Sequence, residues 1–426
     1  MEHGSGTEAI AIVAGCAVVW GLVSARLERV DVTAPIAFVA LGLVVANEPL
    51  ELIEIEAQSE TVRSIAELAL ALVLFADASR VNLRRLRADA AIPVRLLGIG
   101  LPLTIGLGAA LAAAVYGGID LWVAAVIGAA IAPTDAALGS SIIEDRRIPG
   151  RIRRILNVES GLNDGIATPF VNFFIAGALA ESTLRGHTGP GTALVDLGTG
   201  VAAGVAIGLL GGVALRAAWK RGWGMRDFGP VAVLGLAFLS YAGAIELGGN
   251  GFVAAFVAGL AFGSAVREDS TTVGLTSDAG GVISLLVWFL FGAAMIVPAL
   301  EHATWQDALY AVVALTVVRM LPVAIALGGA GLSRSTVLFV GWFGPRGLAS
   351  VVFGLIAFDE LGGGDGRHVL AAVTATVLLS VLAHGITARP WGRRYGNRTS
   401  SLGTERPEHA PTDALPARRI RGRTGS

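Results

Sequence analysis

Long apolar runs, separated by short polar or charged stretches, make up most of the chain. A helix that crosses the hydrocarbon core of a bilayer needs about 20 mostly apolar residues, and by this rule the sequence contains about thirteen candidate spans. The pattern therefore predicts an all-α, polytopic membrane protein. The candidate spans are residues 8–25, 33–47, 62–79, 92–116, 119–142, 157–181, 192–218, 229–247, 250–267, 279–299, 306–330, 335–358 and 367–388.

The amino-acid composition supports the same conclusion. Of the 426 residues, 54% are hydrophobic and 15% are charged, whereas soluble domains carry about 25% charged residues. The 57 glycines suit closely packed membrane helices, because small residues let helix backbones approach. The single cysteine, Cys16, excludes a disulfide framework. The net charge of −1 indicates no particular partner, and we expect a lipid bilayer but no nucleic acid among the partners.

The loops alternate in charge along the chain. Residues 80–87, 144–154 and 216–226 carry most of the basic residues between spans, and the C-terminal segment is rich in arginine. By the positive-inside rule these segments are cytoplasmic, which predicts an N-terminus outside, a C-terminus inside and an odd number of spans. The acidic N-terminus lacks the basic region of a signal peptide, so the first run is expected to be a retained helix. We expect a multi-pass plasma-membrane protein with a disordered cytoplasmic tail over residues 391–426.

Two of the candidate spans are interrupted. Pro133 lies inside the span 119–142 and Pro345 lies inside the span 335–358, which also contains several glycines. A proline inside a helix removes a backbone hydrogen bond and breaks or kinks the helix. Interrupted segments at corresponding positions of two halves are typical of secondary transporters. The sequence therefore predicts two inverted six-helix repeats, joined by the span 192–218, with the fifth and twelfth helices broken and crossed.

Charged and polar residues gather around the first break. If the span that follows is helical, Ser160 and Asp164 lie four residues apart on one face, and Glu159 and Asn163 form a neighbouring pair. The break also frees backbone carbonyls next to the hydroxyl of Thr134. Hydroxyl, carboxylate and carbonyl oxygens suit a hard cation, and a charge at membrane depth is costly enough to indicate function. The alternative is a buried polar cluster that only locks two helices together.

Asp77 and Arg319 are further charged residues at or near membrane depth. Asp77 either supplies a second carboxylate to the cation site or pairs with Arg80 at a helix end. Arg319 lies inside an apolar run, and because arginine stays charged when buried it needs an anion. Glu159 is the partner that we expect for it.

The remaining two charges flank the breaks. Arg346 follows Pro345 and is expected to complement the C-terminal end of the half-helix before it. Asp135 is expected to complement an N-terminal helix end across the crossing. We interpret both arginines, Arg319 and Arg346, as groups that hold the geometry and electrostatics of the site without touching the ion.

Four motifs resemble the monovalent cation:proton antiporters of the NhaP and sodium/proton exchanger type. They are L-F-A-D-A-S-R at 74–80, A-P-T-D at 132–135, E-S-G-L-N-D-G at 159–165 and G-W-F-G-P-R-G at 341–347. The resemblance extends to about Arg389 and implies a thirteen-helix fold that forms a homodimer. It implies a transmembrane antiporter domain over residues 1–390, with core helices roughly at 62–181 and 279–388 and dimerisation or scaffold helices roughly at 8–47 and 192–267.

The resemblance also assigns roles to residues of the site. Asp164 matches the family's aspartate that carries the ion and the proton, and Ser160 and Thr134 match ligands. Asp77 matches a third-helix carboxylate that is usually glutamate. The resemblance thus implies a Na+ site at Asp164, Ser160, Thr134 and Asp77. The residues that support the site are Asn163, Asp135, Glu159, Arg319 and Arg346.

The function implied is exchange of Na+ or Li+ for H+, with cation and proton competing for Asp164. Asn163 stands where electrogenic relatives carry a second aspartate, which implies electroneutral one-for-one exchange. No cofactor is implied beyond the transported ions, and the protein is not expected to be an enzyme. The alternatives are a K+/H+ antiporter on the same fold, a passive channel, and an intramembrane aspartyl protease that would use the G-x-G-D motif at Gly362–Asp365.

Overall fold

The computed structural model describes residues 4–30, 32–48, 50–53, 55–81, 90–135, 137–181, 190–266, 272–400 and 406–410. The helices are α1 (Gly4–Leu27), α2 (Ala34–Ala46), α3 (Glu60–Ser79), α5 (Ala91–Arg95), α6 (Leu101–Tyr116), α7 (Leu121–Ala130), α8 (Ser140–Ile143), α9 (Gly150–Glu181), α10 (Pro190–Lys220), α11 (Gly229–Glu246), α12 (Gly251–Ala265), α13 (Gly274–Leu290), α14 (Ile296–Glu301), α15 (Trp305–Val313), α16 (Arg319–Ala326), α17 (Arg334–Trp342), α18 (Leu348–Leu361) and α19 (Gly363–Ser400). Short helical turns are η1 (Glu28–Val30), η2 (Leu96–Gly100), η3 (Arg226–Phe228), η4 (Phe291–Met295), η5 (Ala314–Val318) and η6 (Pro407–His409).

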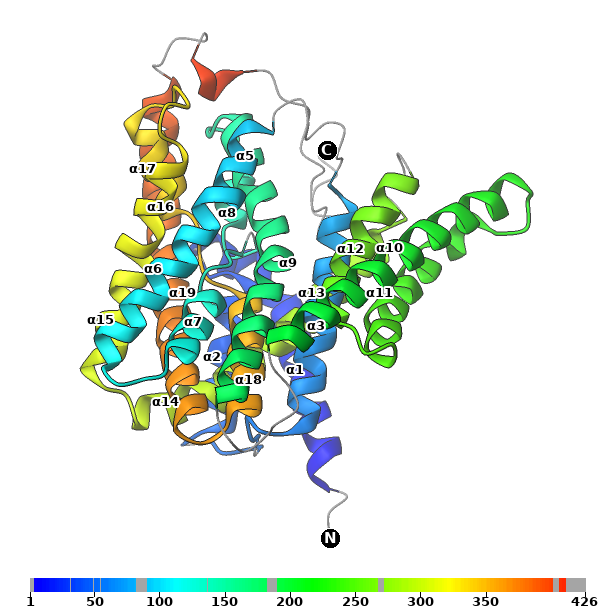
Figure 1. Cartoon of the computed structure of the whole chain (residues 1–426). Helices are drawn as coiled ribbons and strands as arrows, with labels where there is room; N and C mark the ends of the chain where they lie inside the picture. Colours follow the sequence, from blue (N-terminus) through cyan, green and yellow to red (C-terminus); the bar gives the residue numbers. More distant parts are fainter. Residues whose placement is uncertain are drawn as a thin grey trace.

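The helices occupy the predicted apolar runs, so the prediction of an all-α membrane protein is confirmed. Within the described ranges, six helices of at least 18 residues are long and apolar enough to cross a membrane, and four shorter apolar helices of 10–17 residues accompany them. Helices α10, α11 and α12 pack on one another and lie on the right in Figure 1. Helices α15, α16 and α17 lie on the left, and α7, α9 and α18 run between the two groups.

Three of the long helices contain a π-helical turn, and a proline explains each turn. Proline has no N–H to bond the carbonyl four residues before it. For Pro102, Pro298 and Pro322 that carbonyl lies inside η2, η4 and η5 respectively. The wider π-helical turn accommodates the carbonyl that has no N–H partner, so the helix continues past it. Each of these helices therefore continues along its predicted span with a local irregularity.

The two predicted interruptions are present. Asp120 caps the start of α7, since its carboxylate accepts hydrogen bonds from Trp122 N and Val123 N, and the helix ends at Ala130. Residues 131–135 and 137–139, between α7 and α8, are not helical. The second interruption separates α17 from α18 over residues 343–347. The two non-helical stretches touch, since the Asp135 N–H donates to the Pro345 carbonyl at 2.7 Å.

The boundaries differ from the predictions at two places. Helix α9 begins at Gly150 rather than at 157, so part of the basic loop is helical. Helix α19 continues to Ser400, so the prediction of a disordered tail from 391 is wrong for residues 391–400. Tertiary packing explains the extension: the ring of Tyr395 stacks on Phe339 of α17 with centroids 4.0 Å apart.

A short segment beyond α19 is also packed on the protein. Glu408, in η6, has no exposed surface and accepts hydrogen bonds from Ser333 N at 2.7 Å and Thr336 Oγ1 at 2.9 Å. Arg151 of α9 donates to the Pro407 carbonyl at 2.6 Å. Residues 401–405 and 411–426 of the predicted tail, and residues 82–89 of the first basic loop, lie outside the described residues.

Candidate cation site

Helix α9 carries the central group of polar residues. Glu159, Ser160 and Asn163 are buried, with 3%, 8% and 2% of their surface exposed. Asp164 is half-buried, and its backbone carbonyl accepts a hydrogen bond from Thr168 Oγ1 at 2.8 Å. The helical spacing puts Ser160 and Asp164 on one face of α9, as the sequence predicts.

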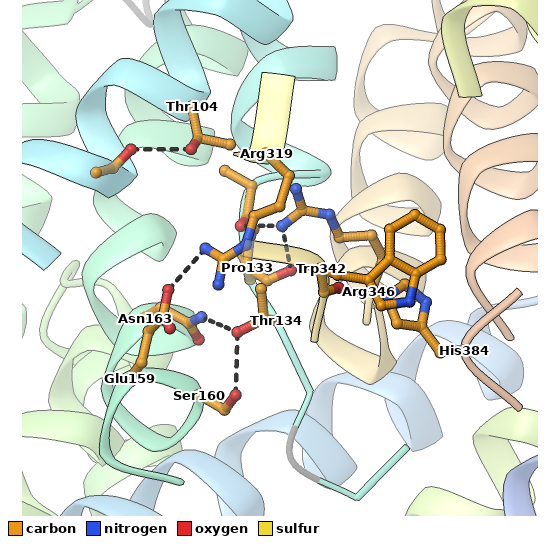
Figure 2. Close-up of polar contacts among 12 residues, drawn as sticks. Thr104, Pro133, Thr134, Glu159, Ser160, Asn163, Arg319, Trp342, Arg346 and His384 are labelled. Carbon is orange, nitrogen blue, oxygen red and sulfur yellow. Dashed lines mark hydrogen bonds and ion pairs between the residues drawn. The ribbon is translucent and has the colours of Figure 1, made fainter. Parts of the chain in front are cut away.

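Thr134 links the broken α7 segment to this face. Its Oγ1 lies 3.0 Å from Ser160 Oγ and accepts a hydrogen bond from Asn163 Nδ2 at 2.7 Å (Figure 2). A cavity of about 10 Å³ opens beside Ser160 and Asp135, which is room for about one water-sized group. Hydroxyl oxygens and a cavity of this size thus occur together where α9 meets the break.

Asp77 lies close to the same face of α9. A Cβ atom added to Gly161 would lie 3.7 Å from the Asp77 Cβ, so α3 and α9 approach closely between Ser160 and Asp164. Asp77 Oδ1 is also 3.9 Å from Arg80 Nη1, with both side chains partly exposed. A partly exposed pair at this distance contributes little energy. Both expectations for Asp77, a cation ligand and a helix-end ion pair, fit this position.

Arg319 and Glu159 form a buried ion pair. Arg319 Nη1 donates to Glu159 Oε1 at 2.6 Å, and the two side chains are 5% and 4% exposed. Arg319 is the first residue of α16, directly after η5. Its guanidinium group lies against Gly344, where an added Cβ would come within 2.5 Å of Arg319 Nε. A side chain at residue 344 would therefore displace this guanidinium group, and glycine lets the second break approach the ion pair closely.

The Arg346 side chain bonds to the first break and not to the end of α17, where it was expected. Its Nη1 donates to the carbonyls of Ala132 at 2.5 Å and Pro133 at 3.2 Å. It therefore complements the C-terminal end of α7, and the expectation that it complements α17 is wrong. The side chain is fully buried. It reaches across because the two non-helical stretches pack on each other, a contact that sequence order alone does not reveal.

Asp135 lies at the N-terminus of α18. This position was expected, because a carboxylate complements the partial positive charge at the N-terminal end of a helix. Its Oδ2 accepts a hydrogen bond from Leu348 N at 3.2 Å, and its Oδ1 accepts one from Ala137 N at 2.6 Å. An added Cβ on Gly347 would overlap the Asp135 carboxylate. The site thus uses a carboxylate and a guanidinium group to satisfy helix ends at the two breaks.

The C-terminal end of α17 is satisfied by a residue that the sequence analysis missed. His384 of α19 lies with its Nε2 2.7 Å from the carbonyl oxygen of Trp342, the last residue of α17 (Figure 2). It is 3% exposed. The available signal was a histidine deep within the apolar run 367–388, but nothing in the sequence pairs it with a particular helix end.

The two arginines leave hydrogen-bond donors unused. Within the described part of the chain, Nε and Nη2 of both Arg319 and Arg346 are buried and find no acceptor. An unpaired buried donor costs about 1–3 kcal/mol. A group of this kind is poorly explained by stability alone and is typical of a functional or hydrated site.

These features define a class of protein. A helical membrane protein with two interrupted helices that meet beside buried hydroxyl groups has the architecture of a secondary ion transporter. A family model described as "Sodium/hydrogen exchanger, transmembrane" matches residues 12–394. The chain belongs to this family. Family members are cation:proton antiporters, which are transporters and not enzymes.

Individual relatives carry names for both alkali cations. The chain is 27% identical over 334 residues to the K(+)/H(+) antiporter NhaP of Alkalimonas amylolytica, covering 77% of this chain and 57% of that protein. It is 26% identical over 373 residues to the Na(+)/H(+) antiporter ApNhaP of Aphanothece halophytica, covering 82% and 67%. The chain thus spans little more than half the length of the first relative.

The fold resembles a solved structure. The sodium proton antiporter MjNhaP1 of Methanocaldococcus jannaschii at pH 8 aligns with a TM-score of 0.75 and 19% identity, covering 91% of this chain and 98% of that one. At this identity the likeness concerns the fold alone.

The aspartyl protease alternative has no support, since its motif lies at the junction of α18 and the first turn of α19.

Proposed function

We propose that the protein exchanges Na+ or Li+ for H+ across a membrane, and that the two ions compete for Asp164. The observation that carries the proposal is the contact of the first break with α9. Thr134 bonds to Ser160 and Asn163, and Asp164 lies four residues from Ser160 on the same helical face. Hydroxyl and carboxylate oxygens of this kind suit a partly dehydrated alkali cation. We include Asp77 as the fourth ligand because it approaches the same face.

Competition at one carboxylate makes exchange obligatory. Asp164 carries either a proton or a cation, and each neutralises its charge. The empty, charged site does not cross the barrier, because an uncompensated charge in a low-dielectric region is costly. Each crossing therefore carries one of the two ions, and the two gradients supply the energy. No cofactor takes part in this scheme.

One-for-one exchange follows from the role of Asn163. Its amide does not titrate, and its Nδ2 donates to Thr134. Glu159 is paired with Arg319 and is assigned to holding the helices together. We assign Asp164 as the single carboxylate that takes up a proton in place of the cation, with Asp77 contacting the cation only, so exchange is electroneutral. A voltage-insensitive transport rate in proteoliposomes would support this stoichiometry.

A K+/H+ antiporter is the second candidate, because relatives with K(+)/H(+) names match the chain. Ligand type does not separate the two ions, since cavity size and field strength decide between them. The test is proton flux in proteoliposomes with Na+, Li+ and K+ added in turn at several pH values. Flux with Na+ and Li+ supports the first candidate, and flux with K+ supports the second.

Asp164→Asn tests the assignment of the site in the same assay. We expect loss of cation-driven proton flux, because the neutral amide binds no proton for exchange. The matched control is Asp227→Asn, which removes the same charge at an exposed position in η3. Exchange that persists in Asp164→Asn would overturn the assignment. Flux of protons without any counter-cation in the unmodified protein would favour a channel.

Orientation and assembly belong to the same proposal. We place the N-terminus outside and the C-terminus in the cytoplasm of a plasma-membrane protein, on the distribution of basic loops. Helices α1 and α10 expose apolar side chains such as Leu22 at 80% and Leu210 at 69%, and we assign them to the face of a homodimer. Cysteine cross-linking along α1 and α10 in membranes tests this assignment.

A further inference from the structure

One face of α19 carries three polar residues toward α17. Ser380 and His384 are four residues apart and are 0% and 3% exposed, and Thr387 follows one turn later. Polar groups at membrane depth are costly unless they are hydrogen-bonded. The cation scheme proposed above assigns no role to any of them.

His384 closes the end of α17. The last carbonyls of a helix lack intrahelical partners, and Trp342 is the last residue of α17. A carbonyl oxygen only accepts, so the 2.7 Å contact requires a hydrogen on His384 Nε2. His384 Nδ1 lies 2.8 Å from the carbonyl oxygen of Ser380, one turn earlier in α19. The imidazole also stacks on the Trp342 ring, with centroids 5.2 Å apart and an angle of 26° between the planes.

Ser380 connects the same face to the second break. Its hydroxyl oxygen accepts the Arg346 N–H at 2.7 Å and lies 3.2 Å from His384 Nδ1. Both residues therefore fix the backbone between α17 and α18, His384 at the helix end and Ser380 a few residues later. The Arg346 side chain continues from this anchored backbone to the carbonyls of Ala132 and Pro133.

The hydrogen bonds form a continuous path to the cation ligands. It runs from α19 through Arg346 to Pro133, and the next residue is Thr134, which bonds to Ser160. In Figure 2, His384, Trp342 and Arg346 lie to the right of Thr134 and Ser160. A movement of the Arg346 backbone would pass directly to the Pro133 carbonyl.

We propose that His384 and Ser380 are positioning residues of the cation site, which act through Arg346 to hold the first break in its cation-binding geometry. This inference rests on the proposed function. Neither residue touches the ion. Because a small misplacement of a ligand weakens binding without removing the carboxylate, their loss raises the apparent KM for the cation more than it lowers the maximal rate.

Paired variants of His384 separate hydrogen bonding from packing. Glutamine places an amide N–H near the position of Nε2, so His384→Gln keeps a donor for the Trp342 carbonyl. Asparagine is shorter and loses that donor. Ser380→Ala removes the acceptor for the Arg346 N–H and tests the path independently. Thr387→Val is the control, because Thr387 accepts the Trp342 Nε1–H at 2.9 Å from the same face but has no bond to the break.

The measurement is cation-driven proton flux in proteoliposomes, with apparent KM and maximal rate determined separately. We expect His384→Asn and Ser380→Ala to raise the KM about fivefold to tenfold, the equivalent of one lost hydrogen bond. The KM of His384→Gln and of Thr387→Val should stay near that of the unmodified protein. The inference is overturned if Ser380→Ala leaves KM unchanged, if glutamine and asparagine are equally impaired, or if Thr387→Val raises KM as much. Absence of exchange in the unmodified protein would instead overturn the proposed function.

Discussion

Replacing Glu159 by glutamine tests the electrostatic core of the site. The change keeps the shape of the side chain and removes its charge. Arg319 then loses the carboxylate that its Nη1 contacts at 2.6 Å, at a position where the side chain is 5% exposed. Breaking one side of a buried ion pair costs about 3–5 kcal/mol. We expect a loss of this size in the free energy of unfolding.

The reverse substitution, Arg319→Gln, is expected to cost less. The charges of Glu159 and Arg319 both act on Arg346. Removal of Arg319 therefore leaves Glu159 with a remaining positive neighbour, whereas removal of Glu159 leaves two buried guanidinium groups that repel each other. The larger loss of stability expected for Glu159→Gln therefore depends on the nearby Arg346 and not only on the distance within the Glu159–Arg319 pair.

The assay is a double-mutant cycle followed by denaturant unfolding in detergent micelles, with tryptophan fluorescence as the signal. The Glu159→Gln/Arg319→Gln variant should lose less than the sum of the two single changes, with a coupling of about 1–3 kcal/mol. It should also retain cation/proton exchange, since neither residue is assigned to the ion. Additive losses, or single losses below about 1 kcal/mol, would refute the view that this pair is buried and mutually dependent.

Substitutions at three further residues give distinct outcomes. Gly347→Ala should abolish exchange, because its Cβ would overlap the Asp135 carboxylate; proton flux equal to that of the unmodified protein would contradict the packing of the breaks. Asp77→Asn should raise the cation KM whereas Asp77→Glu keeps exchange, and equal kinetics in both would assign Asp77 to the helix end. Glu408→Gln should lower the melting temperature, because Glu408 accepts hydrogen bonds from Ser333 and bonds to a charged group contribute about 1.5–3 kcal/mol. Burial opposes ionisation of Glu408, but the hydrogen bonds from Ser333, Thr336 and its own backbone together outweigh burial and lower the pKa of the carboxyl. This stabilisation is therefore present above the ordinary pKa of 4.5 and is lost as pH falls through the lowered pKa. A melting temperature of Glu408→Gln that matches that of the unmodified protein at pH 7 would contradict it.

The sequence alone was sufficient to predict the features that depend on local chemistry. Apolar runs indicated where the helices lie, because the length of a run measures what a bilayer requires. Pro133 and Pro345 indicated the breaks, because proline removes a backbone donor. The spacing of Ser160 and Asp164 indicated one helical face.

Features that depend on packing between distant segments were not available from the sequence. Arg346 was expected to complement the C-terminal end of α17, the half-helix before it. It donates instead to a carbonyl just beyond the end of α7, because the two breaks lie against each other. His384 was missed because its acceptor lies 42 residues away in the sequence. The end of α19 was placed too early because the packing of Tyr395 on Phe339 outweighs the polar composition there.

The dependence of the apparent cation KM on pH tests the central claim most directly. If cation and proton compete for Asp164, the KM of the unmodified protein rises as pH falls, by up to about tenfold per pH unit for a single titrating group, while the maximal rate at saturating cation stays constant. A KM that does not change with pH, or a maximal rate that falls while KM stays constant, would contradict competition at a single carboxylate.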